Sequence, residues 1–344
     1  MPAPLRLIVD TAAIADNWRW LRAAGGGAAC GAAVKADGYG LGAVQAVRAL
    51  AAAGCRDFFV ATWDEAAALG VLPDGVRLSV LHGIGPNEEH LAAGSAAPVL
   101  NTVGQVARWR EVAAGRACDI MIDTGINRLG LSLAEATSGL LDGVAVETLH
   151  SHLACADEPD HPMNAMQLRR FREAVARIPH ARASLANSAG IGLGRDYAFD
   201  LTRPGLSLYG GVANAAASGH LRQVARIEAR VVQVRDIAAG DSFGYGATWT
   251  ASRPTRLAIV NLGYADGYRR AFSDAGHALV DGRPCPVVGR VSMDLTGIDV
   301  TGTDVGEGDW TEIAYDLAAA SAATGIAQYE LLTGLGHRYQ RRYL

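Results

Sequence analysis

The chain has 344 residues, of which 50% are hydrophobic and 19% are charged, and its formal net charge is −4. This length allows a large α/β barrel with a second, smaller domain, and the apolar fraction argues against intrinsic disorder. The small net charge, without blocks of like charge, argues against nucleic acid or an anionic membrane as the main partner. An enzyme that acts on a small molecule fits these bounds better.

Cysteine usage and the N-terminus indicate the compartment. The five cysteines are scattered along the chain without CxxC spacing, which is not the pattern of a disulfide framework or a zinc knuckle. No stretch of about 18 consecutive apolar residues occurs, and residues 1–6 lack the charged start and long apolar core of a signal peptide. We therefore expect a soluble cytoplasmic protein without a metal site.

The first half of the chain alternates between strand-like and helix-like segments. A leading segment, residues 1–10, carries a strand over residues 5–9 that we expect to pair with the C-terminal domain. Between residues 11 and 220, eight short apolar runs are separated by helix-like stretches. The runs are residues 28–34, 57–61, 76–82, 97–101, 117–123, 144–151, 183–187 and 202–209. Eight such repeats favour a closed (β/α)₈ TIM-like barrel over an open parallel sheet.

Two helix starts within this region have the spacing of a capping box. Thr62 is followed three residues later by Glu65, and Ser132 is followed three residues later by Glu135. In a capping box the hydroxyl accepts from the backbone N–H of the acidic residue, whose carboxylate accepts in return from the backbone N–H of the capping residue.

After residue 220 the pattern changes to strands without long helices between them. The expected strands cover residues 227–234, 256–262, 278–280 and 287–291, so residues 221–344 are predicted to form a mostly β C-terminal domain. Asp281-Gly282, which lies between two of these runs, is typical of a β-hairpin turn.

Polar residues follow the predicted barrel strands at the positions where this fold carries its active site. Lys35 and Tyr39 follow the first strand, and Arg128 lies shortly after the fifth. The sixth strand closes with His150 and His152, and the seventh ends at Asn187 and Ser188. The eighth opens with Arg203, followed by Gly205. The serine and glycine after strands seven and eight coincide with the usual phosphate-binding position of the fold. A lysine that faces such a site indicates pyridoxal 5′-phosphate attached covalently to the lysine amine.

The run Ala33-Val34-Lys35-Ala36-Asp37-Gly38-Tyr39-Gly40 resembles the pyridoxal-phosphate lysine motif of alanine racemases, although Asp37, Gly38 and Leu41 differ from its usual form. Further segments match the family in the right order. They are residues 123–130 (DTGINRLG), His152 with 156–158 (ADE), 187–188 (NS), 203–205 (RPG), 244–249 (GYGATW), 263–268 (GYADGY) and 289–294 (GRVSMD). The ordered set spans nearly the whole chain.

This resemblance implies an alanine racemase that works as a cytoplasmic homodimer and supplies D-alanine for peptidoglycan. Lys35 and Tyr245 would be the two catalytic bases, acting on the D-alanine and L-alanine sides. Arg128 and the backbone of Met293 would bind the substrate carboxylate. The residues expected to bind the cofactor are Lys35, Tyr39, His152, Asn187, Ser188, Arg203, Gly205 and Leu206. Tyr245 and Met293 would reach into the active site of the partner subunit, so the C-terminal domain would complete that site.

Two positions depart from the family pattern. Some members have a lysine two residues before the equivalent of Asp123, which can be carbamylated to hold the arginine equivalent to Arg128, but Met121 stands here. Asn127, a bound anion or another residue would have to orient Arg128 instead. Near the C-terminus, His337 lies near the place of a tyrosine that gates the active-site entrance in the family.

Other functions remain open at this stage. A broad-specificity amino-acid racemase of the same fold is one alternative, although such enzymes are often exported. A decarboxylase of this barrel class is expected to place an acid, not Arg203, against the cofactor ring nitrogen. A non-catalytic pyridoxal-phosphate-binding protein would lack the C-terminal domain that carries Tyr245. His150 and His152 share one face of a strand, but no third ligand for a metal is evident.

Overall fold

The computed structural model describes residues 3–113 and 115–344. Within it the chain divides into two compact units, of which one is Ala12–Arg222. The other combines the N-terminal segment up to Thr11 with Gln223–Leu344. The first two residues of the predicted leading segment lie outside the described residues.

Parallel strands form the centre of the unit Ala12–Arg222. Seven of them pair in the order β3-β4-β5-β6-β7-β8-β9, and β10 pairs with β2. The bounds are β2 (Ala29–Cys30), β3 (Ala32–Ala33), β4 (Asp57–Val60), β5 (Arg77–Val80), β6 (Ala97–Leu100), β7 (Cys118–Met121), β8 (Val146–His150), β9 (Arg182–Ser184) and β10 (Leu201–Thr202). The N–H of Gly31, between β2 and β3, donates to Thr202 O at 2.9 Å, and Arg203 N donates to Ala186 O at 2.8 Å. These bonds close the sheet on itself, which confirms the predicted (β/α)₈ barrel.

Gly31 is the residue that allows this closure. A Cβ at this position would lie 2.8 Å from the Phe59 ring and 2.9 Å from the carbonyl oxygen of Asp57. Only glycine therefore lets the backbone between β2 and β3 approach β4 this closely. The predicted first strand, residues 28–34, accordingly consists of two short strands with a glycine between them.

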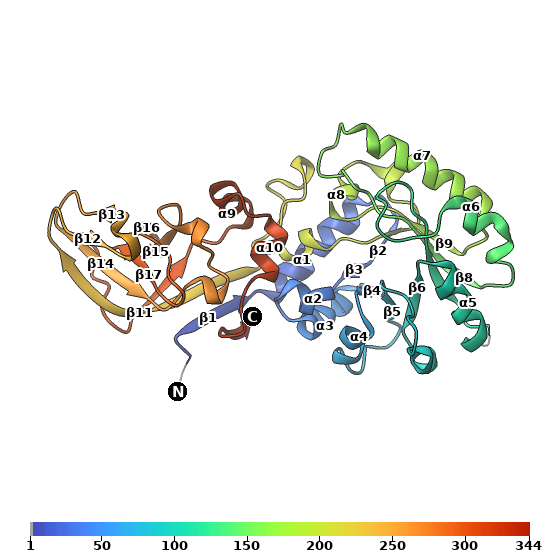
Figure 1. Cartoon of the computed structure of the whole chain (residues 1–344), viewed down its shortest axis with the longest axis horizontal. Helices are drawn as coiled ribbons and strands as arrows, with labels where there is room; N and C mark the ends of the chain where they lie inside the picture. The colour runs from blue at the N-terminus through green and yellow to red at the C-terminus, as the bar shows by residue number, and fades with distance from the viewer. Residues whose placement is uncertain (1–2, 114) are drawn as a thin grey trace. The chain divides into compact units, whose positions relative to one another are not determined.

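Helices cover the outside of the barrel strands (Figure 1). They are α1 (Thr11–Ala24), α3 (Ala43–Ala53), α4 (Trp63–Ala68), α5 (Val103–Val112), α6 (Leu133–Glu135) and α7 (Pro162–Arg177). A further short helix, α8 (Ser188–Ile191), is fully buried after β9. At α6 the capping box predicted for Ser132 and Glu135 is confirmed. At α4 the hydroxyl of Thr62 accepts from Glu65 N as predicted, but the Glu65 carboxylate binds the N–H groups of Ala36 and Ala61 instead of that of Thr62.

The eighth predicted strand, residues 202–209, is shorter than expected. β10 ends at Thr202, and Leu206–Tyr209 form a single 3₁₀ turn that ends at Gly210, whose φ is 89°. Pro204 has no N–H to continue a ladder. The residues of the turn are all buried, and an apolar run of this length does not by itself distinguish a strand from a buried turn.

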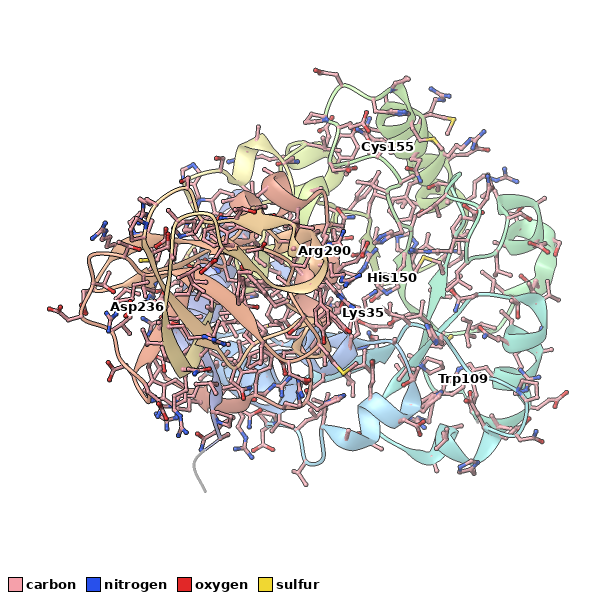
Figure 2. All side chains as sticks on the ribbon, turned by 60° about the vertical axis from the view of Figure 1, so that its left-hand side comes forward. Lys35, Trp109, His150, Cys155, Asp236 and Arg290 are labelled. Carbon is pink, nitrogen blue, oxygen red and sulfur yellow. The ribbon has the colours of Figure 1, made fainter. Side chains whose placement is uncertain are left out.

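The interior of the barrel contains buried ion pairs, whereas barrels of this fold are typically filled by branched apolar side chains. Arg77 donates to both carboxylate oxygens of Asp119, at 2.8 and 2.9 Å. Arg182 does the same with Asp57, at 2.7 and 3.2 Å. The Nε2 atom of His150, labelled in Figure 2, lies 3.4 Å from Asp119, and both of these side chains are fully buried.

The buried surroundings of Asp119 and His150 set their protonation states. Burial would raise the pKa of Asp119, but the adjacent His150 and the charge and hydrogen bonds of Arg77 outweigh it and hold that pKa well below its usual range. Burial lowers the pKa of His150 to about 4, against the opposing interaction with Asp119. Near neutrality Asp119 is therefore ionised, and His150 is neutral.

The second unit is a β domain. Its sheet runs in the order β14-β17-β16-β15-β18-β11-β1-β19, and β12 pairs with β13. The strands are β1 (Leu5–Val9), β11 (Ala225–Ile237), β12 (Ser242–Phe243), β13 (Trp249–Thr250), β14 (Thr255–Val260), β15 (His277–Val280), β16 (Arg283–Val288), β17 (Thr296–Asp299), β18 (Trp310–Ile313) and β19 (Gln340–Tyr343). Two short helices, α9 (Leu317–Thr324) and α10 (Gln328–Thr333), belong to the same unit.

The N-terminal strand is part of this sheet. β1 pairs antiparallel with β11 and parallel with β19. The predicted hairpin at Asp281-Gly282 is confirmed, because these two residues join β15 to β16 with φ values of 49° and 76°. Among the described residues, no helix is both long and apolar enough to cross a membrane.

The buried histidine of the barrel gives a prediction on stability against pH. A histidine in an unfolded chain has a pKa of about 6.5, whereas the folded protein lowers that of His150 to about 4. Between these values the unfolded chain binds a proton that the folded chain excludes, so stability falls as the pH falls through this range. We expect His150→Asn to lessen the loss of unfolding free energy between about pH 7 and about pH 4.5 by about 2 kcal/mol.

Urea unfolding at the two pH values measures this difference. His90→Asn is the matched control, since the side chain of His90 is exposed in the folded protein. An equal loss of stability in the parent and the His150→Asn protein would contradict the prediction.

Candidate active site

Lys35 (labelled in Figure 2) follows β3 after one residue, Val34, at the carboxyl end of a barrel strand. It begins the segment α2 (Lys35–Tyr39), whose residues Ala36, Asp37 and Gly38 have left-handed φ/ψ angles. Gly38 N donates to Val34 O at 2.9 Å, and Gly40 N donates to Ala36 O at 2.8 Å. The glycine-rich loop read from the sequence is thus a left-handed helical turn.

The lysine amine is partly buried. Burial lowers the pKa of Lys35, the charge of Arg128 lowers it further, and the charge of Glu65 opposes both. A lysine in this setting loses its proton more easily than one in water, so it is more available as a nucleophile and a base.

His152 lies near enough to Lys35, Arg128 and Arg203 for their charges to act on it. Burial lowers the pKa of His152 to about 3, and the charges of Arg203, Arg128 and Lys35 add to the effect. The four basic side chains therefore lie close enough to influence one another at the carboxyl ends of the strands. A cluster of this kind attracts anions such as phosphate and carboxylate groups.

Arg203 is the most enclosed of the four, with 7% of its surface exposed. Its Nη2 donates to Ser151 O at 2.5 Å, and its Nη1 donates to the hydroxyl of Ser184. Burial lowers the pKa of Arg203 to about 10, while the charge of Asp119 in the barrel interior works in the opposite direction. Arg203 therefore remains protonated at neutral pH.

Hydroxyl and backbone N–H groups meet after strands β9 and β10. The Ser188 hydroxyl accepts from Gly205 N at 2.9 Å and from Ser207 N at 3.2 Å. A Cβ at Gly205 would overlap the hydroxyl of Tyr39, whose ring stacks on Tyr209 with centroids 4.8 Å apart. We call Tyr39, Ser188 and the backbone of Gly205 the hydroxyl cradle.

Two predicted neighbours complete this part of the site. Asn187 caps α8 by accepting from Gly190 N at 2.8 Å, which fixes the start of the segment that carries Ser188. Leu206 is buried and begins the 3₁₀ turn after Gly205. The structure thus places the residues that the sequence predicted to bind the cofactor in the segments that follow β3, β8, β9 and β10.

Arg128 differs from the other basic groups because it is exposed. In the part of the chain that the structure describes, it forms neither a hydrogen bond nor an ion pair with another residue. Met121 is buried, and its Cγ would lie 3.1 Å from a Cβ on Gly130. The backbone N–H of Asn127 donates to the Asp123 carboxylate at 3.1 Å, a bond that shapes the local turn and does not involve Arg128.

Tyr245 and Met293 belong to the β unit, where both side chains are exposed, by 69% and 53%. Their backbones are held firmly. Met293 O accepts from Ala265 N at 3.0 Å, and a Cβ at Gly263 would overlap this carbonyl oxygen. The turn that carries Tyr245 packs against Arg290, whose Nη1 lies 3.0 Å from the Cβ position of Gly246.

Arg338 fixes the loop that carries Met293. It donates to both oxygens of the buried Asp266, at 2.7 and 2.8 Å, and to Asp294 at 2.6 Å. Its neighbour His337, placed by sequence near a gate position, is exposed.

Sequence reasoning missed two acidic residues near the site. Glu65 approaches the Lys35 turn from the start of α4, and Asp119 lies beneath Arg203 in the barrel interior. The capping-box spacing predicted that the Glu65 carboxylate accepts a backbone hydrogen bond, but not that it accepts from Ala36 N and Ala61 N. Asp119 stands two residues before Met121 within an apolar run, where an acid was itself a signal. Among the described residues, no three or more His, Cys, Asp or Glu side chains group to hold a metal ion.

Comparison with known proteins assigns the family. The family model for the N-terminal domain of alanine racemase matches residues 9–213, and that for the C-terminal domain matches residues 224–343. An alanine racemase of Acidiphilium cryptum is 44% identical, with 97% of each chain covered. One of Rhodospirillum rubrum is 46% identical, with 98% of this chain and 95% of the relative covered.

A solved structure agrees with these relatives. The alanine racemase of Bartonella henselae, which was crystallised with covalently bound pyridoxal phosphate, superposes with a TM-score of 0.92 over 100% of both chains at 37% identity. The two domain matches together cover most of the sequence in the order in which the two units occur. The chain belongs to the alanine racemase family.

Proposed function

We propose that this protein interconverts L-alanine and D-alanine with pyridoxal 5′-phosphate as its cofactor. One observation carries the proposal: a lysine with a lowered pKa lies in the same basic cluster as Arg203, in a barrel whose strand ends also form the hydroxyl cradle. Membership of the family supports the choice of alanine as the substrate.

The residues of the site fit this cofactor. The hydroxyl cradle, with the N–H of Leu206, would hold the phosphate, and an added methyl at Gly205 would fill the space at Tyr39. Asn187 would support the cradle through its cap on α8. Lys35 would bind the cofactor covalently, with His152 beside the ring. When bound, the cofactor supplies an electron sink for the α-carbon of the substrate.

Racemisation requires one base on each face of that carbon. Lys35 would move the proton on the D-alanine side, and Tyr245 on the L-alanine side. A tyrosine has an ordinary pKa of about 10, so acting near neutrality requires a shift of roughly three units, or about 4 kcal/mol. A nearby cation lowers such a pKa by about 1–3 units, and Arg128 is suited to supply that charge.

Arg203 would face the pyridine nitrogen of the cofactor. Its pKa of about 10 means that it keeps its own proton at neutral pH. Arg203 would therefore give no proton to the ring nitrogen, and beside it the cofactor would be a weaker electron sink than beside an acid. This arrangement would favour prompt return of a proton to the α-carbon over transamination.

The substrate carboxylate would bind Arg128, whose charge no described residue pairs, together with the backbone of Met293. We propose that Met293 and Tyr245 come from the partner subunit of a homodimer. In support, both are large exposed side chains on backbone turns that their own unit fixes in place. Residues 11–220 would then bind the cofactor, and residues 221–344 would complete the partner's site.

We further propose that the enzyme works in the cytoplasm and supplies D-alanine for peptidoglycan. All five cysteines are free thiols, and four of them are buried. Unpaired cysteines are typical of a reducing compartment.

The two bases can be tested separately. Lys35→Ala and Tyr245→Phe should each lower kcat for alanine racemisation by at least about 10²-fold, because each removes a proton-transfer group. The assay follows L-to-D and D-to-L conversion of alanine, serine, lysine and arginine, with His90→Asn as an exposed control. A wild-type protein that binds the cofactor but does not racemise alanine would contradict the proposed function.

A mixed-dimer assay tests whether the site is shared. We expect subunits that carry Lys35→Ala to be inactive alone, and likewise subunits that carry Tyr245→Ala. In a mixed dimer one site receives both intact residues, so random mixing of equal amounts should restore about one quarter of the wild-type rate. No recovery after exchange of subunits, shown by a tag on one of them, would count against the shared site.

The role of Arg203 predicts a change in reaction specificity. Arg203→Glu places an acid where the ring nitrogen is expected, so the variant should form more pyruvate by transamination per racemisation event. Pyruvate and D-alanine are measured in the same reaction, and Arg203→Lys serves as the control that keeps a positive charge. An unchanged ratio in the glutamate variant would show that this interpretation is wrong.

A further inference from the structure

The backbone that follows Lys35 is unusual. Ala36 and Asp37 have φ values of 51°, and Tyr39 has a φ of 57°. Together with Gly38 they form four successive left-handed residues, of which three are not glycine. A left-handed conformation is unfavourable for an L-residue with a side chain, because its Cβ comes too close to the following carbonyl oxygen. A turn with three such residues persists only where its surroundings hold it.

Glu65 provides a contact at the start of this turn. Its Oε1 accepts from Ala36 N at 2.7 Å, and its Oε2 accepts from Ala61 N at 2.6 Å. The carboxylate therefore bridges the residue directly after Lys35 and the residue directly after β4. Hydrogen bonds to an ionised acceptor are stronger than those between neutral groups.

The position of Glu65 is itself fixed. Its N–H donates to the Thr62 hydroxyl at 3.2 Å, which caps the first turn of α4. The carboxylate spans two segments that are distant in sequence, in place of the local capping box that the Thr62–Glu65 spacing predicted. This departure places a negative charge beside the lysine.

A second acid holds the far end of the turn. Asp37 Oδ1 accepts from Ala43 N at 2.9 Å, at the first residue of α3. The two acids therefore act at opposite ends. Of the two, Glu65 is the one whose charge raises the pKa of Lys35 against burial and Arg128, so Asp37 offers a control for a structural effect alone.

We propose that Glu65 is a positioning residue for Lys35, whose carboxylate holds the left-handed turn that directs the amine and places a negative charge next to it. The inference rests on the proposed function of Lys35, which holds the cofactor and moves a proton. It assigns two separable effects to one side chain, one on backbone geometry and one on proton affinity.

The variant Glu65→Gln tests both effects with little change in the volume of the side chain. The amide keeps the size of the side chain and removes its charge. Its NH₂ group faces one of the two backbone donors, Ala36 N or Ala61 N, so one of the two hydrogen bonds is lost. In the holoenzyme we expect kcat to fall by about 10-fold. Loss of a neighbouring opposite charge should also shift the pH titration of the lysine-bound cofactor, followed by absorbance, about one unit toward acid.

Ala36→Gly supplies the matched second variant. Glycine adopts a φ of about 50° without the penalty of a side chain, so it relieves strain without touching the carboxylate. In the double variant Glu65→Gln/Ala36→Gly we expect kcat to recover several-fold, while the acid shift of the titration remains. Asp37→Asn should leave the titration where it is in the wild type.

Several results would overturn the proposal. An unchanged titration in Glu65→Gln would remove the electrostatic effect, and an unchanged kcat, or no recovery on adding Ala36→Gly, would remove the positional one. If the wild-type protein bound the cofactor without racemising alanine, the proposed function would fail. The absorbance titration would still decide whether Glu65 acts on Lys35.

Discussion

Crowding of positive charge at the carboxyl ends of the barrel strands is the constraint on which the rest of the site depends. The basic groups that share this space are Lys35, Arg128, His152 and Arg203. Buried like charges destabilise a fold unless protons are lost or carboxylates lie nearby. The protein uses both solutions. His152 is neutral, Glu65 lies beside the lysine turn, and Asp119 acts on Arg203 from below, where Arg77 and Ser79 hold it in turn.

Arg128 is the exception to this compensation. Met121 provides only a thioether next to this region, and no acidic side chain of residues 3–113 and 115–344 forms an ion pair with the Arg128 guanidinium. Its charge is then available to an incoming carboxylate, which an arginine binds through two parallel hydrogen bonds. The same charge lowers the pKa of Lys35. Substrate binding would partly cancel that effect and raise the proton affinity of the lysine as the α-carbon proton is transferred.

Sequence reasoning predicted the barrel and placed the candidate site residues at its strand ends because both steps follow short-range rules. Strand runs alternate with helices, and in this fold active-site residues follow strand ends. The misses have a different origin. Glu65 binds Ala36, 29 residues away, and Asp119 binds Arg77, 42 residues away. Such pairs depend on strand register and on which neighbour a carboxylate reaches, neither of which a local pattern encodes. The left-handed turn after Lys35 was missed because alanine and tyrosine carry no signal for positive φ, and one aspartate gives only a weak one.

The two proposed bases differ in what sets their chemistry. The environment of Lys35 comes from its own barrel, whereas Tyr245 is exposed on the β unit and takes its environment from whatever covers it. A two-base enzyme needs such groups in complementary protonation states. Because L-alanine and D-alanine are enantiomers of equal free energy, the ratio of kcat/KM in the two directions is fixed at unity. A change at Glu65 that alters only Lys35 must therefore change kcat/KM equally in both directions, although Tyr245 is untouched. Only the separate values of kcat and KM can reveal which face of the substrate the change affects.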